Sequence, residues 1–367
     1  MKALTVGGAM IDTIAVIANE RIERMTMRNA ETSFLLLEEG RKNDAENIST
    51  HCGGGAVNAA VCLARLGLDV AALVKLGQDG RAETILSRLA EEGVSTRFAL
   101  RDARAPTGAS VFLSAHDRNA AIFTFRGANT LLAASDLRTD AFAVDLVYVS
   151  SLSNESADCF PLIIEKAKAA GSTVAANPGI RQLSARQRPF CDVIGKIDIL
   201  AVNRHEAEAL IPWLVARSGE GGPPIKKGPG EELPELARRG FVAGGLELSL
   251  LGFFERVQEH GPRWVVITDG KDGAYVAAPS CVLYCPAVPV LVTSSAGAGD
   301  AFNSTLAARL VEGASVEDAA RAAAANAASV VLYLDTQTGL LRRNDLESRV
   351  ADLQKNLAIR HWKRPSA

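Results

Sequence analysis

The chain has 367 residues, of which 48% are hydrophobic and 22% charged, and its formal net charge is -2. This composition is typical of a globular protein large enough to bury a core without disulfides or structural metals. The near-neutral charge gives no electrostatic reason to expect a nucleic acid or an anionic membrane as partner.

The sequence also gives no sign of membrane insertion or export. No apolar stretch is long enough to predict a transmembrane helix, and the first residues lack the pattern of a secretory signal peptide. The six cysteines show no metal-binding spacing and are expected to be buried free thiols. We therefore expect a cytoplasmic protein.

Short apolar strands alternate with helical segments along most of the chain. Strands are expected at 2–6, 69–77, 145–151, 172–178, 198–203 and 264–268, and helices at 55–67, 78–93, 156–170, 181–195, after residue 300 and at 315–334. Near-continuous apolar strands separated by helices predict a mostly parallel sheet covered on both faces, which is a three-layer α/β/α body. This body would comprise residues 1–12, 51–96 and 129–345, followed by a C-terminal helix and tail at 346–367.

Two segments, 13–50 and 97–128, interrupt this alternation. Each is rich in β-forming residues, and the second contains two such runs around the polar turn "HDRN" at 116–119, which predicts a hairpin. Together they predict a small β-sheet beside the body. The pattern leaves open whether this sheet is a lid over a cleft or an ordinary edge hairpin.

A third segment, 213–247, is dense in glycine, proline and charge. Such a composition is typical of surface loops. We expect a surface insertion there, without a chemical role.

The motif "GGGAVN" at 53–58 begins the first expected helix. It is not a dinucleotide fingerprint, because Asn58 stands where the third glycine is needed. Three glycines let the backbone approach a ligand closely, and the Asn58 amide could both donate and accept hydrogen bonds. A flexible loop with a solvated asparagine is the alternative interpretation.

Further polar residues follow the ends of expected strands, where open α/β sheets bind ligands. Asp12 follows the first strand and could accept sugar hydroxyls or cap a turn. Asn203 and Glu206 follow the strand at 198–203 and could form a helix capping box or face the cleft. Thr268 ends another strand, and it could line a nucleotide or belong to a hairpin turn.

The motif "GAGD" at 297–300 carries the sharpest chemical signal. Gly297 and Gly299 would allow successive N–H groups to converge on an anion at the start of a helix. Asp300 at this helix start would be stabilised as an anion, so we expect its pKa to be lowered. A plain N-cap aspartate is the alternative.

Five segments, in order along residues 1–340, are "GGGAVNAAVCLARLG", "TGASVFL…DRNAAIFTFRGAN", "NRHEAEAL", "TDGKDGAYV" and "SSAGAGDAFNSTLAARL". They resemble the motifs of the ribokinase-like, or phosphofructokinase-B, sugar kinases. The resemblance implies the ribokinase-like fold with its β-lid, and an enzyme that phosphorylates a hydroxymethyl group of a sugar or nucleoside with ATP and Mg²⁺.

The resemblance also implies roles for individual residues. Asp300 would be the catalytic base, and the anion hole for the transferred phosphoryl group would be formed by Gly297, Ala298 and Gly299. Substrate hydroxyls would be held by Asp12, Gly53, Gly54 and Asn58, with a further contact from Asn154 or Glu155. The ATP side would comprise Asn203 and Glu206, which position phosphate and water-bound Mg²⁺, Thr268 and Gly270 in the nucleotide site, and Asn326 near the adenine.

One motif residue departs from the family pattern. Ser294 stands where many members have an aspartate that helps hold a monovalent cation, which argues against activation by such a cation. Two other functions remain open. A nucleoside kinase would use an apolar lid pocket built from Phe34, Phe112, Phe123 and Phe125, whereas a catalytically idle sugar-binding protein would not need Asp300. Pairing of exposed lid faces would give a homodimer.

Overall fold

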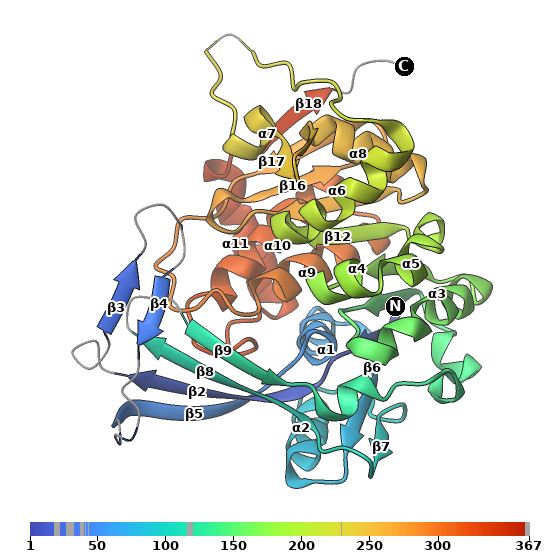
Figure 1. Ribbon diagram of the computed structural model, residues 1–367, viewed down its shortest axis with the longest axis vertical. Helices are drawn as coiled ribbons and strands as arrows, with labels where there is room; N and C mark the ends of the chain where they lie inside the picture. Colours follow the sequence, from blue (N-terminus) through green and yellow to red (C-terminus); the bar gives the residue numbers. More distant parts are fainter. Residues whose placement is uncertain are drawn as a thin grey trace.

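The computed structural model describes residues 1–17, 23–26, 33–36, 40, 42, 44–115, 120–228 and 230–363. Its centre is a ten-stranded sheet with helices on both faces (Figure 1). The parallel strands are, in spatial order, β15 (Trp264–Thr268), β12 (Ile199–Asn203), β11 (Thr173–Ala176), β10 (Leu146–Val149), β1 (Lys2–Gly7), β6 (Asp69–Gly77) and β7 (Leu100–Asp102). Beyond β15, the sheet is extended by the antiparallel strands β16 (Ala274–Ala277), β17 (Cys281–Cys285) and β18 (Arg360–Lys363).

Both faces of the sheet are buried because its strands are apolar at successive positions. In β10, Val147 and Val149 face one core cluster, while Leu146 and Tyr148 face the other. The first cluster is covered by α3 (Phe160–Ala169), α4 (Ile180–Ala185), α5 (Gln187–Cys191), α6 (Arg204–Ser218), α7 (Glu235–Arg239) and α8 (Leu250–Glu259). The second is covered by α1 (Gly55–Arg65), α2 (Gly80–Glu91), α9 (Ala298–Val311), α10 (Val316–Val330) and α11 (Arg343–Asn356).

A second sheet of four strands, which we call the lid sheet, projects from this body (Figure 1). Its strands lie in the order β5 (Ala45–Gly53), β2 (Met10–Ile17), β8 (Gly108–Ala115) and β9 (Ala120–Phe125). The predicted hairpin is β8–β9, and its expected turn at 116–119 lies outside the described residues. β2 begins before residue 13, so the lid sheet includes Asp12, while β7 belongs to the large sheet rather than to the lid segment 97–128.

Shorter elements complete the described chain. A small hairpin consists of β3 (Glu23–Thr26) and β4 (Ser33–Leu36). The 3-10 helices are η2 (Gly127–Thr130), η3 (Ala134–Asp136), η4 (Thr139–Phe142), η5 (Asn154–Cys159), η6 (Ile194–Lys196) and η7 (Gly270–Asp272).

The helix expected at 181–195 is divided into α4, α5 and η6. The division falls at Arg186. Pro189 has no N–H to donate to the carbonyl four residues earlier, at Ala185, so a continuous helix would lose a hydrogen bond there. The missing N–H of Pro189 therefore explains why the helix expected at 181–195 is divided.

The segment 213–247 is not a surface loop throughout. α6 continues to Ser218, and α7 is followed by the hairpin β13 (Phe241–Ala243) and β14 (Leu246–Leu248). Leu236, Phe241 and Leu248 are buried in the core cluster under α6 and α8. The tail also differs from the expectation, because β18 pairs with β17 and Trp362 stacks on Tyr284.

Candidate active site

The turn before α9 has the backbone geometry that its glycines predict. Gly297 is the N-cap of the helix and has a φ of 78°, in the left-handed region that favours glycine. A Cβ at this position would lie 2.7 Å from the Cβ of Thr336, so space as well as conformation requires glycine. The following residues, Ala298 and Gly299, line a cavity with the first turn of the helix, whose N–H groups have no intrahelical acceptors.

Asp300 is the third residue of α9 and not its cap. Its Oδ2 accepts a hydrogen bond of 2.8 Å from Nδ2 of Asn58, which lies in α1. Burial raises the pKa of Asp300, and the Asn58 bond opposes this effect. The expected lowering of the pKa was therefore wrong, because the loss of hydration dominates at this position.

Each glycine of the triple glycine makes room for a neighbour. A side chain at Gly53 would collide with the carboxylate of Asp12, and Gly54 has a φ of 96° with the carbonyl oxygen of Gly8 against it. A Cβ at Gly55 would lie 2.8 Å from the Cβ of Ser150 and 3.4 Å from Oδ1 of Asp300. Gly55 thus keeps a side chain out of the space beside Asp300, and Gly53 keeps one out of the space beside Asp12.

Asp12 lies in β2, and its buried carboxylate accepts a hydrogen bond from the hydroxyl of Ser110 in β8. Burial raises the pKa of Asp12, and the negative charge of Asp300 raises it further, while the Ser110 bond and His51 lower it. The two aspartates therefore border the same polar region, one from the lid sheet and one from the body.

Asn203 and Glu206 form the predicted capping box at the start of α6. The Asn203 side chain accepts from the Glu206 N–H, and the Glu206 carboxylate accepts from the Asn203 N–H, both at 2.8 Å. Both residues also line the cavity, so a helix cap and a position facing the cleft are compatible. Burial raises the pKa of Glu206, and the charge of Asp300 adds to this effect.

The cavity has a volume of about 450 Å³. Its polar lining includes Thr268 and Gly270, as predicted, and also Asn177, which the sequence interpretation missed. Asn177 directly follows β11, so its place after a strand was the available signal. The apolar lining is formed mainly by Val288, Val290, Val292, Ala324, Ala327, Ala328 and Val331.

Two predicted site residues lie away from this arrangement. Asn326 is fully buried, and its amide bonds the hydroxyl of Thr305, the thiol of Cys62 and the N–H of Leu341. These contacts join helices and do not line the cavity, so the structure does not bring Asn326 to the expected adenine site. Glu155 is exposed at the start of η5 and is also absent from the cavity lining.

The lid sheet presents two chemically different faces. Asp12 is opposite Ser110, which is opposite Thr124, so these residues share the face near Asp300. Phe112 lies on that face, two positions from Ser110. Phe123 and Phe125 alternate with Thr124 and lie on the opposite face, where they are 62% and 54% exposed. The aromatic pocket that a nucleoside kinase would need is therefore not assembled from these two residues.

Within the described ranges, no helix is both long and apolar enough to cross a membrane. The six cysteines are all free, and four of them are buried, whereas Cys191 and Cys281 are half-buried. No group of three or more His, Cys, Asp or Glu side chains in the described part of the chain is arranged to hold a metal ion.

The cavity reaches Ala298 and Gly299, which directly precede Asp300 in α9. The protein is a phosphotransferase with an alcohol acceptor. The chain belongs to the pfkB family of carbohydrate kinases, whose model matches residues 22–212 and 251–343. It is a sugar kinase with the ribokinase-like fold.

Individual relatives agree with this assignment. The chain is 27% identical to ribokinase from Bacillus subtilis over 306 residues, covering 80% of this chain and 86% of the relative. It is also 27% identical to deoxyribokinase from Salmonella typhi over 332 residues, covering 89% and 94%. A solved Escherichia coli protein in complex with ATP and Mg²⁺ superposes with a TM-score of 0.72 at 17% identity, covering 96% of this chain and 99% of the other.

Proposed function

We propose that the protein transfers the γ-phosphoryl group of ATP to a hydroxymethyl group of a sugar, as ribokinases and fructokinases do. The observation that carries the proposal is the position of Asp300. One carboxylate oxygen is held by Asn58, and the other faces the space kept open by Gly55, while the neighbouring Ala298 and Gly299 line the cavity.

In the proposed reaction, Asp300 accepts the proton of the sugar hydroxyl. The hydroxyl oxygen then forms a bond to the γ-phosphorus, and the bond from that phosphorus to the β,γ-bridging oxygen breaks, so that ADP leaves. The N–H groups in the first turn of α9 stabilise the charge on the transferred group. Asp12, with Gly53 beside it and Ser110 orienting its carboxylate, would hold sugar hydroxyls and so position the reacting one, with Gly54 next to Gly53 in the same turn.

The cavity suits the nucleotide in size and chemistry. Its volume falls within the range of roughly 300–1,000 Å³ that is usual for small-molecule sites, and its valine and alanine lining suits a base. Thr268 and Gly270 lie at the polar end of β15, where they would contact the ATP. The Asn326 amide is already used within the helices, so the proposal assigns no nucleotide contact to it.

The donor set also fits Mg²⁺. This ion keeps several waters and commonly takes one or two carboxylates beside phosphate oxygens, and Glu206 with the amides of Asn177 and Asn203 provides such a partial set. Mg²⁺ bound there would neutralise phosphate charge. Ser294 has no carboxylate to bind a monovalent cation. Its hydroxyl oxygen accepts a hydrogen bond from the N–H of Ala296.

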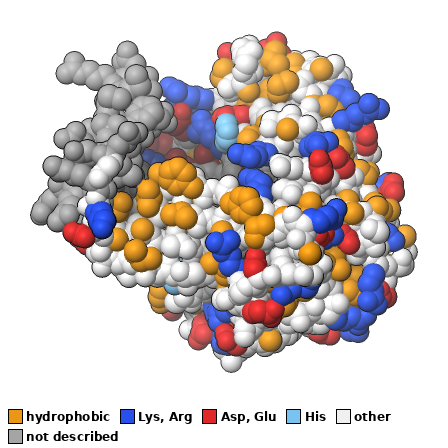
Figure 2. Space-filling view, turned by 60° about the horizontal axis from the view of Figure 1, so that its bottom comes forward, with side chains coloured by type: hydrophobic (Ala, Val, Ile, Leu, Met, Phe, Trp, Pro, Cys, Tyr) orange, Lys and Arg blue, Asp and Glu red, His pale blue; other side chains and the backbone are white. Residues whose placement is uncertain are grey.

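We also infer a homodimer formed through the lid sheet. The face opposite Asp12 carries four exposed apolar side chains, Ile48, Val111, Phe123 and Phe125. Figure 2 shows hydrophobic side chains gathered beside the grey atoms on the face of the molecule that it presents. An apolar sheet face of this kind is typical of an interaction surface.

The function is tested by ADP release measured with pentoses, hexoses, keto-deoxy acids and nucleosides as acceptors. Asp300→Asn is expected to retain the fold and ATP binding and to lower turnover by at least about a hundredfold, the scale of general-base catalysis. Near-normal turnover of this variant would remove Asp300 from the mechanism. Release only with nucleosides would favour a nucleoside kinase, and sugar binding without release would favour an idle binding protein.

A further inference from the structure

The side-chain amide of Asn58 has hydrogen-bond partners at both ends. Its Nδ2 donates to Oδ2 of Asp300 at 2.8 Å. Its Oδ1 accepts from the hydroxyl of Thr336 at 2.8 Å and from Nε2 of Gln337 at 3.2 Å. Because an amide has one donor end and one acceptor end, the two donors at Oδ1 select the orientation in which the N–H group faces Asp300.

Gln337 is itself held in one orientation by partners that cannot exchange roles. Its Nε2 also donates to the backbone carbonyl of Cys52 at 3.0 Å, and a carbonyl only accepts. Its Oε1 accepts from Nε of Arg88 at 3.1 Å, and a guanidinium only donates. Reversing the Gln337 amide would break both bonds, so the direction of the contact with Asn58 is determined from outside the site.

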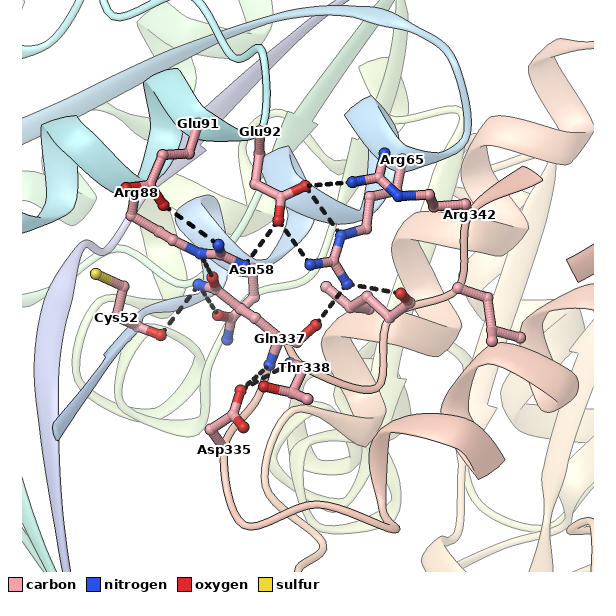
Figure 3. Close-up of polar contacts among 12 residues, drawn as sticks. Cys52, Asn58, Arg65, Arg88, Glu91, Glu92, Asp335, Gln337, Thr338 and Arg342 are labelled. Carbon is pink, nitrogen blue, oxygen red and sulfur yellow. Dashed lines mark hydrogen bonds and ion pairs between the residues drawn. The ribbon is translucent and has the colours of Figure 1, made fainter. Parts of the chain in front are cut away.

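The outer end of this network is anchored on α1 and α2 (Figure 3). Arg88 forms an ion pair of 2.7 Å with Glu92, and Arg65 binds the same carboxylate while donating to the backbone carbonyl of Gln337 at 2.8 Å. The Glu92 side chain is 5% exposed, and the Arg65 bond lowers its pKa. Gln337 therefore has fixed contacts at both its backbone and its side chain.

Thr336 links the same network to the anion hole. Its side chain contacts Gly297 so closely that a Cβ on that glycine would lie 2.7 Å from the Thr336 Cβ, and its hydroxyl donates to Asn58. Thr336 and Gln337 are both buried, and neither lines the nucleotide cavity.

We infer that Thr336 and Gln337 are positioning residues for catalysis: they orient the Asn58 amide so that its N–H group faces Asp300, and thereby set the pH range in which Asp300 can accept a proton. The inference rests on the proposed role of Asp300 as base. It changes the role that the resemblance implied for Asn58, because the amide acts on the catalytic carboxylate in addition to any contact with the sugar.

The orientation of the Asn58 amide affects the protonation of Asp300 because the neighbouring groups do not stabilise its negative charge. The titratable groups whose pKa is raised by the charge of Asp300 are Asp12 from β2, Glu206 from α6 and Tyr148 from β10, and none of them supplies a positive charge to the site. Within the described part of the chain, Asn58 is the side chain that donates to the carboxylate. Without this donor, burial would raise the pKa of Asp300 further, and protonation would remove the base at a higher pH.

The test compares pH profiles of kcat/KM for the sugar. Thr336→Val removes the hydroxyl with little change in volume, and Gln337→Met removes the amide and retains a side chain of similar length. In the double variant, the acid limb of the profile is expected to move to higher pH by about one pH unit, the size expected for loss of a hydrogen bond to a charged group. Thr336→Ser restores the hydroxyl and should return the limb toward the wild-type position.

Thr338→Val serves as the matched control. It makes the same substitution two residues along the chain, at a residue that bonds Asp335 and not Asn58. Its acid limb should stay at the wild-type pH. A loss of kcat or stability in the double variant with an unmoved acid limb would show a structural role and overturn the inference, as would an equal movement in Thr338→Val.

The outcome separates this inference from the proposed function. If Asp300→Asn retains turnover, the proposed function itself fails. If Asp300→Asn is inactive but the acid limb of the double variant stays at the wild-type position, only the positioning role fails. If the double variant does not fold, Gln337→Met alone decides this point, because it removes the donor whose direction is fixed from outside the site.

Discussion

Asn326 provides a direct test between a nucleotide contact and a structural contact. In the structure it is fully buried in α10, where it donates to Thr305 at 2.8 Å and accepts from the Leu341 N–H at 2.9 Å. Asn326→Leu keeps the branched shape and the number of side-chain heavy atoms and removes both bonds. The N–H of Leu341 then has no partner, which costs about 1–3 kcal/mol, and the lost bond to Thr305 adds about 1 kcal/mol.

The free energy of unfolding, measured by urea denaturation, should therefore fall by about 2–4 kcal/mol. The KM for ATP should remain close to that of the wild type, since Asn326 does not line the cavity. Ala327→Leu is the contrasting control, because Ala327 does line the cavity: it should raise the KM for ATP with a smaller loss of stability. Wild-type stability of Asn326→Leu together with a raised KM for ATP would refute the structural assignment and restore the adenine contact.

Two further predictions concern the lid sheet. In Gly53→Ala the new methyl group would collide with Asp12, so the KM for the sugar should rise at least about tenfold while the KM for ATP is little changed. An unaltered KM for the sugar would remove Asp12 from substrate binding. For the proposed homodimer, sedimentation should give twice the mass of the 38.7 kDa chain, and Phe123→Lys, which places a charge on the exposed lid face, should shift it toward the monomer. A wild-type protein that sediments as a monomer at micromolar concentration would contradict the dimer.

The sequence determined the sheet and most of the position of the site. Apolar strands that alternate with helices require a parallel sheet buried on both faces, and the carboxyl ends of parallel strands meet at one edge. For this reason Asn203, Thr268 and the helix start at Gly297 could be expected at a common cleft from their places in the chain alone. The glycines were equally informative, since left-handed backbone at Gly54 and Gly297 is a local requirement.

Only the tertiary structure decided how these groups affect one another. The pKa of Asp300 depends on burial that no local pattern records, and the helix start by itself indicated the opposite direction. Asn58 and Gln337 are 279 residues apart in the chain, and Asn58 and Asp300 are 242 apart, so their contacts exist only once the helices pack. Asn326 shows the same limit, because a polar residue in a helix can face a ligand or satisfy buried groups of neighbouring helices. Local rules act over a few residues, whereas desolvation and long-range hydrogen bonds are set by which surfaces the fold brings together.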